Sequence, residues 1–258
     1  MRLAQQLRVV RNPPITIAAI PEGCDPAIIE LVAFDEPSLR AVATLRGTDL
    51  VRLVPAPAWP YAAIGRSPAM TLAVADARRD GFTRSLLEAR RAGALNVAVV
   101  GTASPPAPAE LRALLRAYDA VLPVVVTPGA DAEASLARAV ALITAFATAN
   151  TVSIPVDEAY PFFVRSGLLV CGAGEGDDLA SAFARAVTDA AVGEGARRPL
   201  RTLLHIETTP SGLLGDLDLV GRLLTDAVGG GELWLTASTS EGARRRVSIV
   251  AACPSPLA

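Results

Sequence analysis

The chain has no lysine, since all 24 of its Lys and Arg positions are arginine. This absence excludes chemistry that requires a lysine amine, namely Schiff-base formation, attachment of pyridoxal phosphate and the lysine of a P-loop. Histidine occurs once, at His205, which excludes a histidine-rich metal centre. We therefore expect no metal site and no lysine-dependent cofactor.

Cysteine is also scarce. Cys24, Cys171 and Cys253 lie far apart in apolar sequence and lack the spacing of metal ligands. This pattern is typical of buried thiols in a reducing compartment, so we expect three small core residues and a cytoplasmic protein. The first ten residues lack the apolar stretch of a signal peptide, and no later run is long enough to span a bilayer.

The chain also lacks a large net charge of either sign. The 258 residues carry a formal net charge of −2, which argues against a nucleic-acid binder because phosphate contacts require a basic face. Hydrophobic residues make up 51% of the chain, enough to form one large core or two smaller ones without disulfides or metal.

The longest helical pattern covers residues 131–149. Asp131 is a suitable N-cap, Glu133 favours the positive end of the helix dipole, and Asn150 can adopt the left-handed conformation that ends a helix. Apolar residues cover more than one side of this helix. It is therefore either a core helix of one domain or a spine between two domains.

Before this helix, apolar runs alternate with helical stretches, which predicts a parallel sheet covered on both faces. We expect residues 25–30 to form a short helix or loop and 44–69 to be mostly loop. The predicted strands are 15–20, 31–34, 50–54, 70–75, 95–100 and 120–126, and the predicted helices are 84–92 and 108–117.

After the central helix, the pattern predicts an α+β arrangement with helices packed on one sheet. The predicted strands are 168–171, 202–207, 232–237 and 246–252, and the predicted helices are 178–191 and 216–228. Residues 238–245 are predicted to form a hairpin loop. The domain organisation we expect is an α/β domain at 1–130, the central helix at 131–150 and an α+β domain at 151–258.

Three local motifs admit a functional and a structural interpretation. The glycines of 172–176 suggest a dinucleotide loop, but Asp177 and Asp178 would oppose a phosphate there, which favours a tight turn. His205 with Ser211 and Asp216 could be combined into a hydrolase triad, yet no nucleophile elbow supports it. The cluster of Arg244, Arg245 and Arg246 is either a solvated tip paired with Glu241 or a contact for an acidic partner.

Several stretches resemble FtsZ, the tubulin-like GTPase of bacterial cell division. In the second half, the strand, small-residue turn and Ala-rich helix of 167–187 are similar to that family, and 202–253 follows the rest of its C-terminal domain in order and spacing. In the first half, 70–75 and 91–100 are similar to the strands before and after its main phosphate loop. The resemblance implies a tubulin/FtsZ-like fold with a Rossmann-like parallel-sheet domain, a central helix and a C-terminal α+β domain.

The phosphate loops of that family require glycine-rich backbone close to the anion. The matching turns here are 21–23, where Pro21 and Glu22 precede Gly23, and 76–81, which contains Asp76, Arg78, Arg79, Asp80 and Gly81. The carboxylates repel a triphosphate, and the two arginines offset this in part. The resemblance therefore implies a degenerate nucleotide site that binds no cofactor.

The family's catalytic loop supplies two carboxylates to the neighbouring subunit. The matching positions here are Pro155, Asp157 and Tyr160, so one carboxylate is replaced by a phenol, which cannot polarise water at neutral pH. We therefore expect a pseudo-GTPase with no catalytic residues.

Two functions follow from these observations. The first is a non-catalytic bacterial protein that regulates, or assembles with, a filament-forming FtsZ-type GTPase, or self-associates, through a surface that includes Asp157, Tyr160 and Arg165. The second is an enzyme or small-molecule binder that reuses the remodelled cleft, with Arg78, Arg79 and Asp157 as polar contacts.

Overall fold

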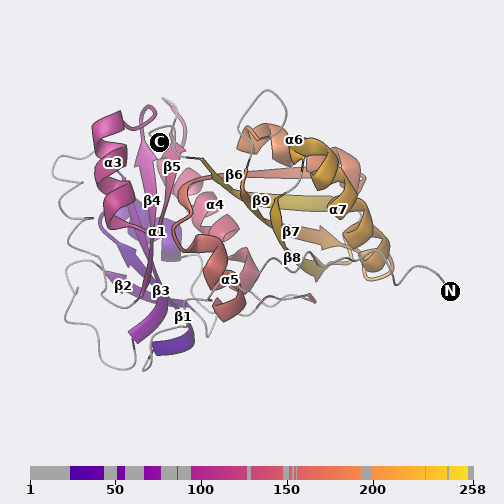
Figure 1. Ribbon diagram of the computed structural model, residues 1–258, viewed down its shortest axis with the longest axis horizontal. Helices are drawn as coiled ribbons and strands as arrows, with labels where there is room; N and C mark the ends of the chain where they lie inside the picture. Colours follow the sequence, from indigo (N-terminus) through magenta and orange to yellow (C-terminus); the bar gives the residue numbers. More distant parts are fainter. Residues whose placement is uncertain are drawn as a thin grey trace.

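The structure is a computed structural model that describes residues 24–43, 51–55, 67–76, 86, 94–126, 129–147, 151–152, 154, 156–192, 199–229, 231–242 and 244–254. These residues form two halves that lie side by side and share one nine-stranded sheet, with the order β2-β1-β3-β4-β5-β6-β9-β7-β8 (Figure 1). The predicted strand 15–20 and most of the predicted helix 84–92 lie outside the described residues.

The first half contains the parallel strands β1 (Cys24–Ala33), β2 (Val51–Pro55), β3 (Ser67–Asp76), β4 (Leu95–Thr102) and β5 (Ala120–Val125). Every residue of β4 is buried, because helices cover both faces of the sheet. Val97 and Val99 pack in the cluster on one face, whereas Ala98 and Val100 pack on the other. The prediction of a parallel sheet buried on both faces is confirmed.

Helix α1 (Glu36–Ala43) and the central helix cover one face, and α3 (Pro108–Ala117) covers the other. The predicted helix 108–117 is confirmed at both ends. The prediction that 25–30 forms a short helix or loop is wrong, because this segment belongs to β1 and pairs with β3. Glu30 is fully buried in that strand, a placement that its charge did not predict.

The second half contains β6 (Gly167–Gly176), β7 (Arg201–Thr208), β8 (Glu232–Thr239) and β9 (Arg245–Cys253). The predicted hairpin at 238–245 is wrong, since β7 lies between β8 and β9 and pairs with both. A short Gly-containing loop between two apolar runs favours a hairpin locally. In the structure, however, β8 and β9 each pair with β7 instead of with one another. The local sequence around the loop holds no information about this third strand.

Helices α6 (Leu179–Ala190) and α7 (Leu213–Val228) cover one face of this half, as predicted, and Asp178 caps α6 by accepting from the Ser181 N–H at 2.8 Å. The predicted tight turn at 172–176 is instead the end of β6. A Cβ atom at Gly172 would lie 2.3 Å from Ala190 N, and one at Gly174 would lie 2.1 Å from Ala182 O. These two glycines therefore allow α6 to pack directly on the strand.

The predicted central helix is α4 (Ala132–Thr144), continued by the 3₁₀ turn η2 (Ala145–Ala147). The Asp131 carboxylate accepts from the N–H groups of Glu133 and Ala134, which confirms the predicted N-cap. The helix packs against β3, β4 and β5 of the first half and against β6 and β9 of the second. This placement supports the spine interpretation, and Asn150 lies outside the described residues.

Candidate functional site

The carboxyl ends of β1, β3 and β4 meet at one edge of the first half, where open α/β sheets bind ligands. Asp35 follows β1, Asp76 ends β3, and the parallel register places Asp76 opposite Gly101 of β4. This edge is therefore the place to look for a phosphate-binding site.

Asp35 occupies the N-terminus of α1 at this edge. Its Oδ1 atom accepts from the Ser38 N–H at 2.8 Å, and its backbone oxygen accepts from the Leu39 N–H at 2.9 Å. Its Oδ2 atom accepts from the Asp76 N–H at 2.8 Å. Backbone N–H groups at a helix start are the groups that hold phosphate in nucleotide sites. Here an internal carboxylate occupies one of them, the Ser38 N–H.

Asp76 adds a second acidic residue at the same point. The residue is 3% exposed, so its carboxyl group is enclosed in the protein rather than presented to solvent. Two acidic residues joined by a backbone hydrogen bond make this edge unfavourable for a polyphosphate. Of the residues predicted for the degenerate site, Asp76 lies at this edge, whereas Gly23, Arg78, Arg79 and Gly81 lie outside the described residues.

The sequence reasoning missed Asp35, although a local signal for it exists. Asp35 is followed by Glu36, Pro37 and Ser38, and an Asp before an acidic residue and a proline is a common start of a helix. The bridge from Asp35 to Asp76, which spans 41 residues, has no such local signal.

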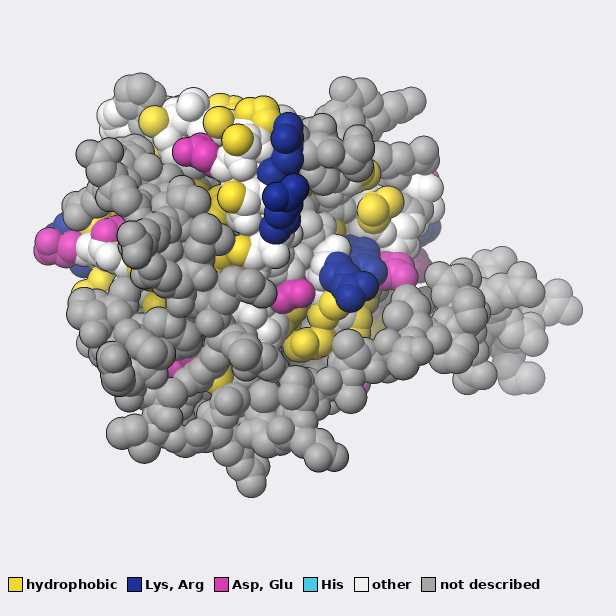
Figure 2. Space-filling model, turned by 60° about the vertical axis from the view of Figure 1, so that its left-hand side comes forward, with side chains coloured by type: hydrophobic (Ala, Val, Ile, Leu, Met, Phe, Trp, Pro, Cys, Tyr) yellow, Lys and Arg dark blue, Asp and Glu magenta, His cyan; other side chains and the backbone are white. Residues whose placement is uncertain are grey.

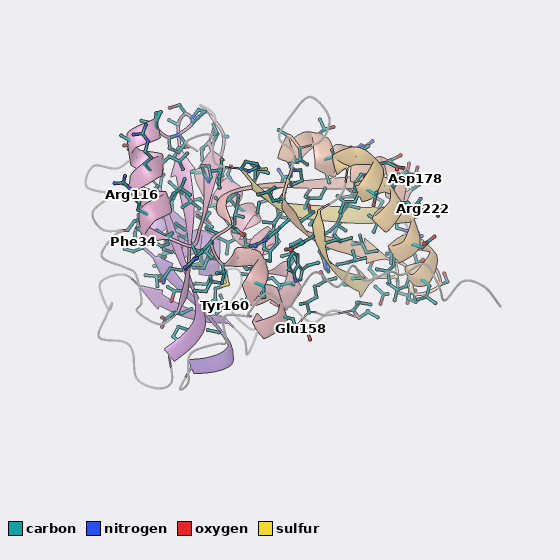
Figure 3. The ribbon with its side chains drawn as sticks, viewed as in Figure 1. Phe34, Arg116, Glu158, Tyr160, Asp178 and Arg222 are labelled. Carbon is teal, nitrogen blue, oxygen red and sulfur yellow. The ribbon has the colours of Figure 1, made fainter. Side chains whose placement is uncertain are left out.

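The predicted interaction surface lies on and after helix α5 (Val156–Phe163), so the segment expected to be a catalytic loop is helical. Asp157 and Tyr160 are one helical turn apart, and Arg165 follows the helix as an exposed residue with a φ of 52°. Tyr160 is partly buried against the core, whereas Glu158 is exposed (Figure 3). Part of the predicted surface is thus accessible and part is packed.

Contacts with the second half hold α5 in place. The guanidinium of Arg201 donates to the carbonyl oxygens of Pro161 at 3.0 Å and Val164 at 3.1 Å, at the C-terminal end of the helix. The indole N–H of Trp234 donates to the Glu158 carbonyl at 3.1 Å, and its ring packs edge-on against Phe162. These contacts join α5 to the second half.

His205 is not part of a catalytic triad. Its two ring nitrogens lie 2.9 Å from Thr236 Oγ1 and 3.1 Å from Ser238 Oγ, and burial lowers its pKa below the usual range. Asp216 is engaged elsewhere, with the Thr208 hydroxyl and with Arg245 at 3.3 Å. Both ring nitrogens of His205 therefore have hydrogen-bond partners on β8.

The arginine cluster is paired, but with other partners than expected. Arg244 lies 3.0 Å from Glu175, and Arg246 lies 3.4 Å from both Glu175 and Glu207. The pairing of the cluster with Glu241 is therefore wrong, because β9 places these side chains beside β6 and β7. The hydrogen bond from Arg244 also lowers the pKa of the Glu175 carboxyl group.

On the face shown in Figure 2, the described arginine side chains lie in separate groups rather than in one continuous basic surface. In the described part of the chain, no cluster of three or more His, Cys, Asp or Glu side chains could hold a metal ion. None of the helices described here is long and apolar enough to cross a membrane.

No protein-family model matches the sequence, and no curated protein matches it. Solved structures do match the fold. An empty FtsZ dimer from M. jannaschii has a TM-score of 0.69 and 15% identity, covering 90% of this chain and 89% of that one.

Two further structures have a similar fold. TubZ from Bacillus thuringiensis serovar israelensis, in GDP-form protofilaments, has a TM-score of 0.62 and 9% identity over 90% of this chain and 87% of its own. CetZ2 from Haloferax volcanii, in a GTPγS-bound protofilament, has a TM-score of 0.59 and 12% identity over 88% of this chain and 94% of its own. The chain therefore has the FtsZ/tubulin-like fold that its sequence resemblance implied.

Proposed function

We propose that this protein is a pseudo-GTPase that regulates, or assembles with, a filament-forming GTPase of the FtsZ type. The fold supports a role beside such filaments, since the structures of TubZ and CetZ2 that it resembles are protofilaments. The proposal places the protein in the bacterial cytoplasm, in cell division or cytoskeletal organisation.

The observation that carries the proposal is the position of Asp35. A nucleotide site at this edge requires free N–H groups and a positive potential. Asp35 accepts hydrogen bonds from the Ser38 and Asp76 N–H groups and adds a negative charge at the start of α1. A γ-phosphate would have to displace this carboxylate and remain beside it, which Coulomb repulsion opposes.

The α5 segment gives a second argument. The family's catalytic loop, which the resemblance aligns with 155–160, has a carboxylate where this chain has Tyr160. A phenol is neutral at pH 7 and cannot take over a role that requires negative charge. We therefore expect no GTP turnover even at an interface between subunits.

The partner surface in this proposal is formed by α5 and the turn after it. Asp157, Tyr160 and Arg165 supply a carboxylate, a phenol and a guanidinium within one short segment. Tyr and Arg are enriched at protein interfaces, which suits Tyr160 on α5 and Arg165 in the turn after it.

The experiment is co-sedimentation and GTP turnover of the host's own FtsZ-type GTPase with increasing amounts of this protein, and with this protein alone plus GTP as the control. We expect a change in pelleted polymer or in turnover, and no turnover by this protein alone. No effect on the partner GTPase contradicts the regulatory role, and hydrolysis by this protein alone contradicts the pseudo-GTPase assignment.

Variants locate the surface in the same assay. Asp157→Ala, Tyr160→Ala and Arg165→Ala should each weaken the effect by about 5- to 30-fold, the range of about 1 to 2 kcal/mol for interface side chains. Arg222→Ala on α7 removes a comparable exposed arginine, paired with Asp218, and should leave the effect unchanged. If all three variants retain full activity, the surface lies elsewhere.

A further inference from the structure

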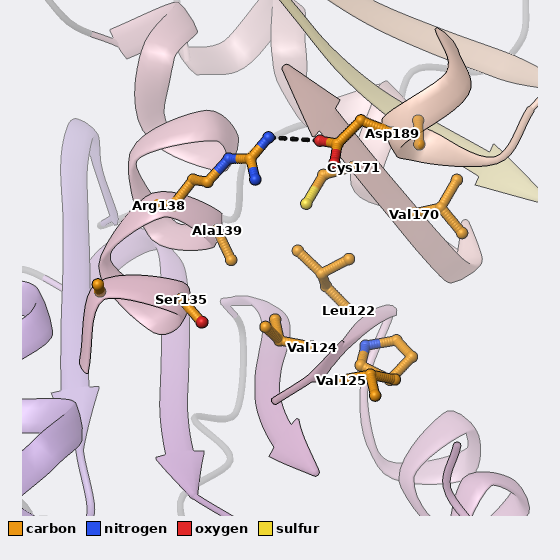
Figure 4. Close-up of a pocket in the computed structure, with 12 residues that line it drawn as sticks. Leu122, Val124, Val125, Ser135, Arg138, Ala139, Val170, Cys171 and Asp189 are labelled. Atoms are coloured by element: carbon orange, nitrogen blue, oxygen red, sulfur yellow. Dashed lines mark hydrogen bonds and ion pairs between the residues drawn. The ribbon is translucent and has the colours of Figure 1, made fainter. Parts of the chain in front are cut away.

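A cavity of about 460 Å³ lies where the two halves of the sheet separate (Figure 4). Strands β5 and β6 pair through Ala120 with Gly167 and through Val121 with Leu168, and their ladder ends there. Pro123 has no N–H to donate, which favours the end of pairing at this point. Beyond it the strands diverge, and α4 and α6 form the other walls of the cavity.

The cavity has an apolar side and a polar side. Leu122 and Val124 from β5, Ala139 from α4 and Val170 from β6 make up the apolar side. On the polar side, Arg138 of α4 and Asp189 of α6 form an ion pair at the rim, and the Cys171 sulfur points into the cavity (Figure 4). A small ligand in this space would therefore meet both kinds of surface.

The ion pair also satisfies the open edge of β6. Asp189 accepts from the Ala173 N–H at 2.9 Å, and Arg138 donates to the Ala173 carbonyl at 3.5 Å. Backbone groups alternate between the two edges of an antiparallel strand, so Cys171, two residues earlier, directs its N–H and C=O to the same edge. Strand β5 has diverged at that point, and the cavity takes its place.

The charges of the cavity cancel. Arg138 is paired with Asp189, and burial raises the pKa of the Cys171 thiol to about 11, which keeps it neutral. Arg138 uses Nη2 for its contacts, so Nε and Nη1 have no partner among the described residues. Because the ion pair has no net charge, it gives neither an anionic nor a cationic ligand a net electrostatic attraction that would offset the loss of its hydration.

We infer that this cavity binds an uncharged small molecule that combines an apolar body with an amide group. The amide carbonyl accepts from the Cys171 N–H or from Arg138, and the amide N–H donates to the Cys171 carbonyl. The apolar body packs against Leu122, Val124 and Val170. Volume, an apolar wall and a few convergent polar groups are the usual features of small-molecule sites.

The site links the two halves, because its walls come from β5 and α4 on one side and from β6 and α6 on the other. A bound ligand therefore stabilises their present arrangement against separation. This inference does not depend on the proposed regulatory function, since the residues that line the cavity include neither Asp35 nor Asp76 and none of α5.

The test uses octanamide as the probe, with octanoate and octylamine as matched compounds of the same chain length. Binding is measured by titration calorimetry and by ¹H–¹⁵N chemical-shift mapping of the full chain. We expect saturable binding of octanamide, weaker binding of the two charged compounds by at least about tenfold, and the largest shifts at Cys171 and Ala173.

Two variants fill the cavity from its accessible wall, Ala134→Trp on α4 and Val125→Trp at the end of β5. Each folded variant, checked by circular dichroism, should lose at least about tenfold in octanamide affinity. Arg138→Ala should weaken binding by about 3- to 10-fold, corresponding to one hydrogen bond, whereas Arg222→Ala should have no effect. Absence of saturable binding to the wild type, or unchanged binding in the folded tryptophan variants, overturns the inference.

Discussion

His205 lies on β7, and its ring is held between the hydroxyl groups of Thr236 and Ser238 on β8. Both partners can act as donor or acceptor, so the neutral imidazole is satisfied in either tautomer. Burial disfavours the charged ring and lowers its pKa below the ordinary value, although Glu207 acts in the opposite direction. This residue therefore links stability to pH.

We expect acid to destabilise the protein in part through His205. The pKa of His205 is lower in the folded protein than in the unfolded chain, where it is about 6.5. The contribution of His205 to the free energy of unfolding is therefore fully present above this unfolded value. As the pH falls through it, the unfolded chain binds a proton that the folded chain resists, and stability is lost. Urea unfolding at pH 8 and pH 5 should show a smaller loss of stability for His205→Gln than for the wild type. An equal loss in both proteins contradicts the prediction.

Asp35 has two structural roles. As an N-cap it stabilises α1 by about 1 kcal/mol, a role that many helices fill with Asp or Ser. The same carboxylate accepts from the N–H of Asp76 on β3, and in the proposed function this contact removes a donor that a phosphate would need.

At the scale of elements, the packing of α6 on β6 depends on glycine. Gly172 and Gly174 leave no room for a Cβ, since the atoms that it would meet belong to the helix backbone and cannot move independently. The β6 ladder with β9 holds the strand from the other side. Neither element can shift without breaking other contacts.

Gly174→Ala should therefore destabilise the protein by at least about 3 kcal/mol or prevent folding. The matched control is Gly221→Ala on α7, where an added Cβ meets nothing within 4 Å and should stabilise the helix by up to about 1 kcal/mol. Thermal and urea unfolding measure both effects. Equal stability of Gly174→Ala and the wild type would show that α6 does not pack on the strand as described.

At the scale of the whole molecule, one hydrophobic cluster extends through both halves. It contains Ile29 and Leu72 from the first half and Leu203 and Val250 from the second. Phe146, Phe162 and Phe163 connect them, with ring centroids 5.7 Å apart for Phe146 and Phe163 and 4.8 Å apart for Phe162 and Phe163. A shared core couples the unfolding of the two halves.

We expect a single cooperative unfolding transition. In a Trp59→Phe variant, Trp234 is the remaining tryptophan and reports on the second half, so its fluorescence and the far-UV circular dichroism should change at the same urea concentration. Phe162→Ala should lower stability by about 3 to 5 kcal/mol, whereas Leu214→Ala, at an 82% exposed position, should change it by less than about 0.5 kcal/mol. Separate transitions for the two probes contradict this coupling.

The sequence by itself determined the features that depend on neighbours a few residues apart. The caps at Asp131 and Asp178, the helix at 108–117 and the apolar strands at 70–75 and 95–100 all follow from local hydrogen bonding or from burial on both faces. The resemblance that pointed to the fold rested on the order of such elements.

Tertiary structure alone decided which distant segments meet. Strand β7 lies between β8 and β9, so the expected hairpin does not form. Residues 172–176 belong to strand β6 instead of a tight turn, and their glycines allow α6 to pack closely on that strand. It also brought Asp35 to Asp76 and opened the cavity between β5 and β6. The physical reason is that strand pairing and side-chain packing depend on groups far away in the chain, whose positions a local pattern of residues does not contain.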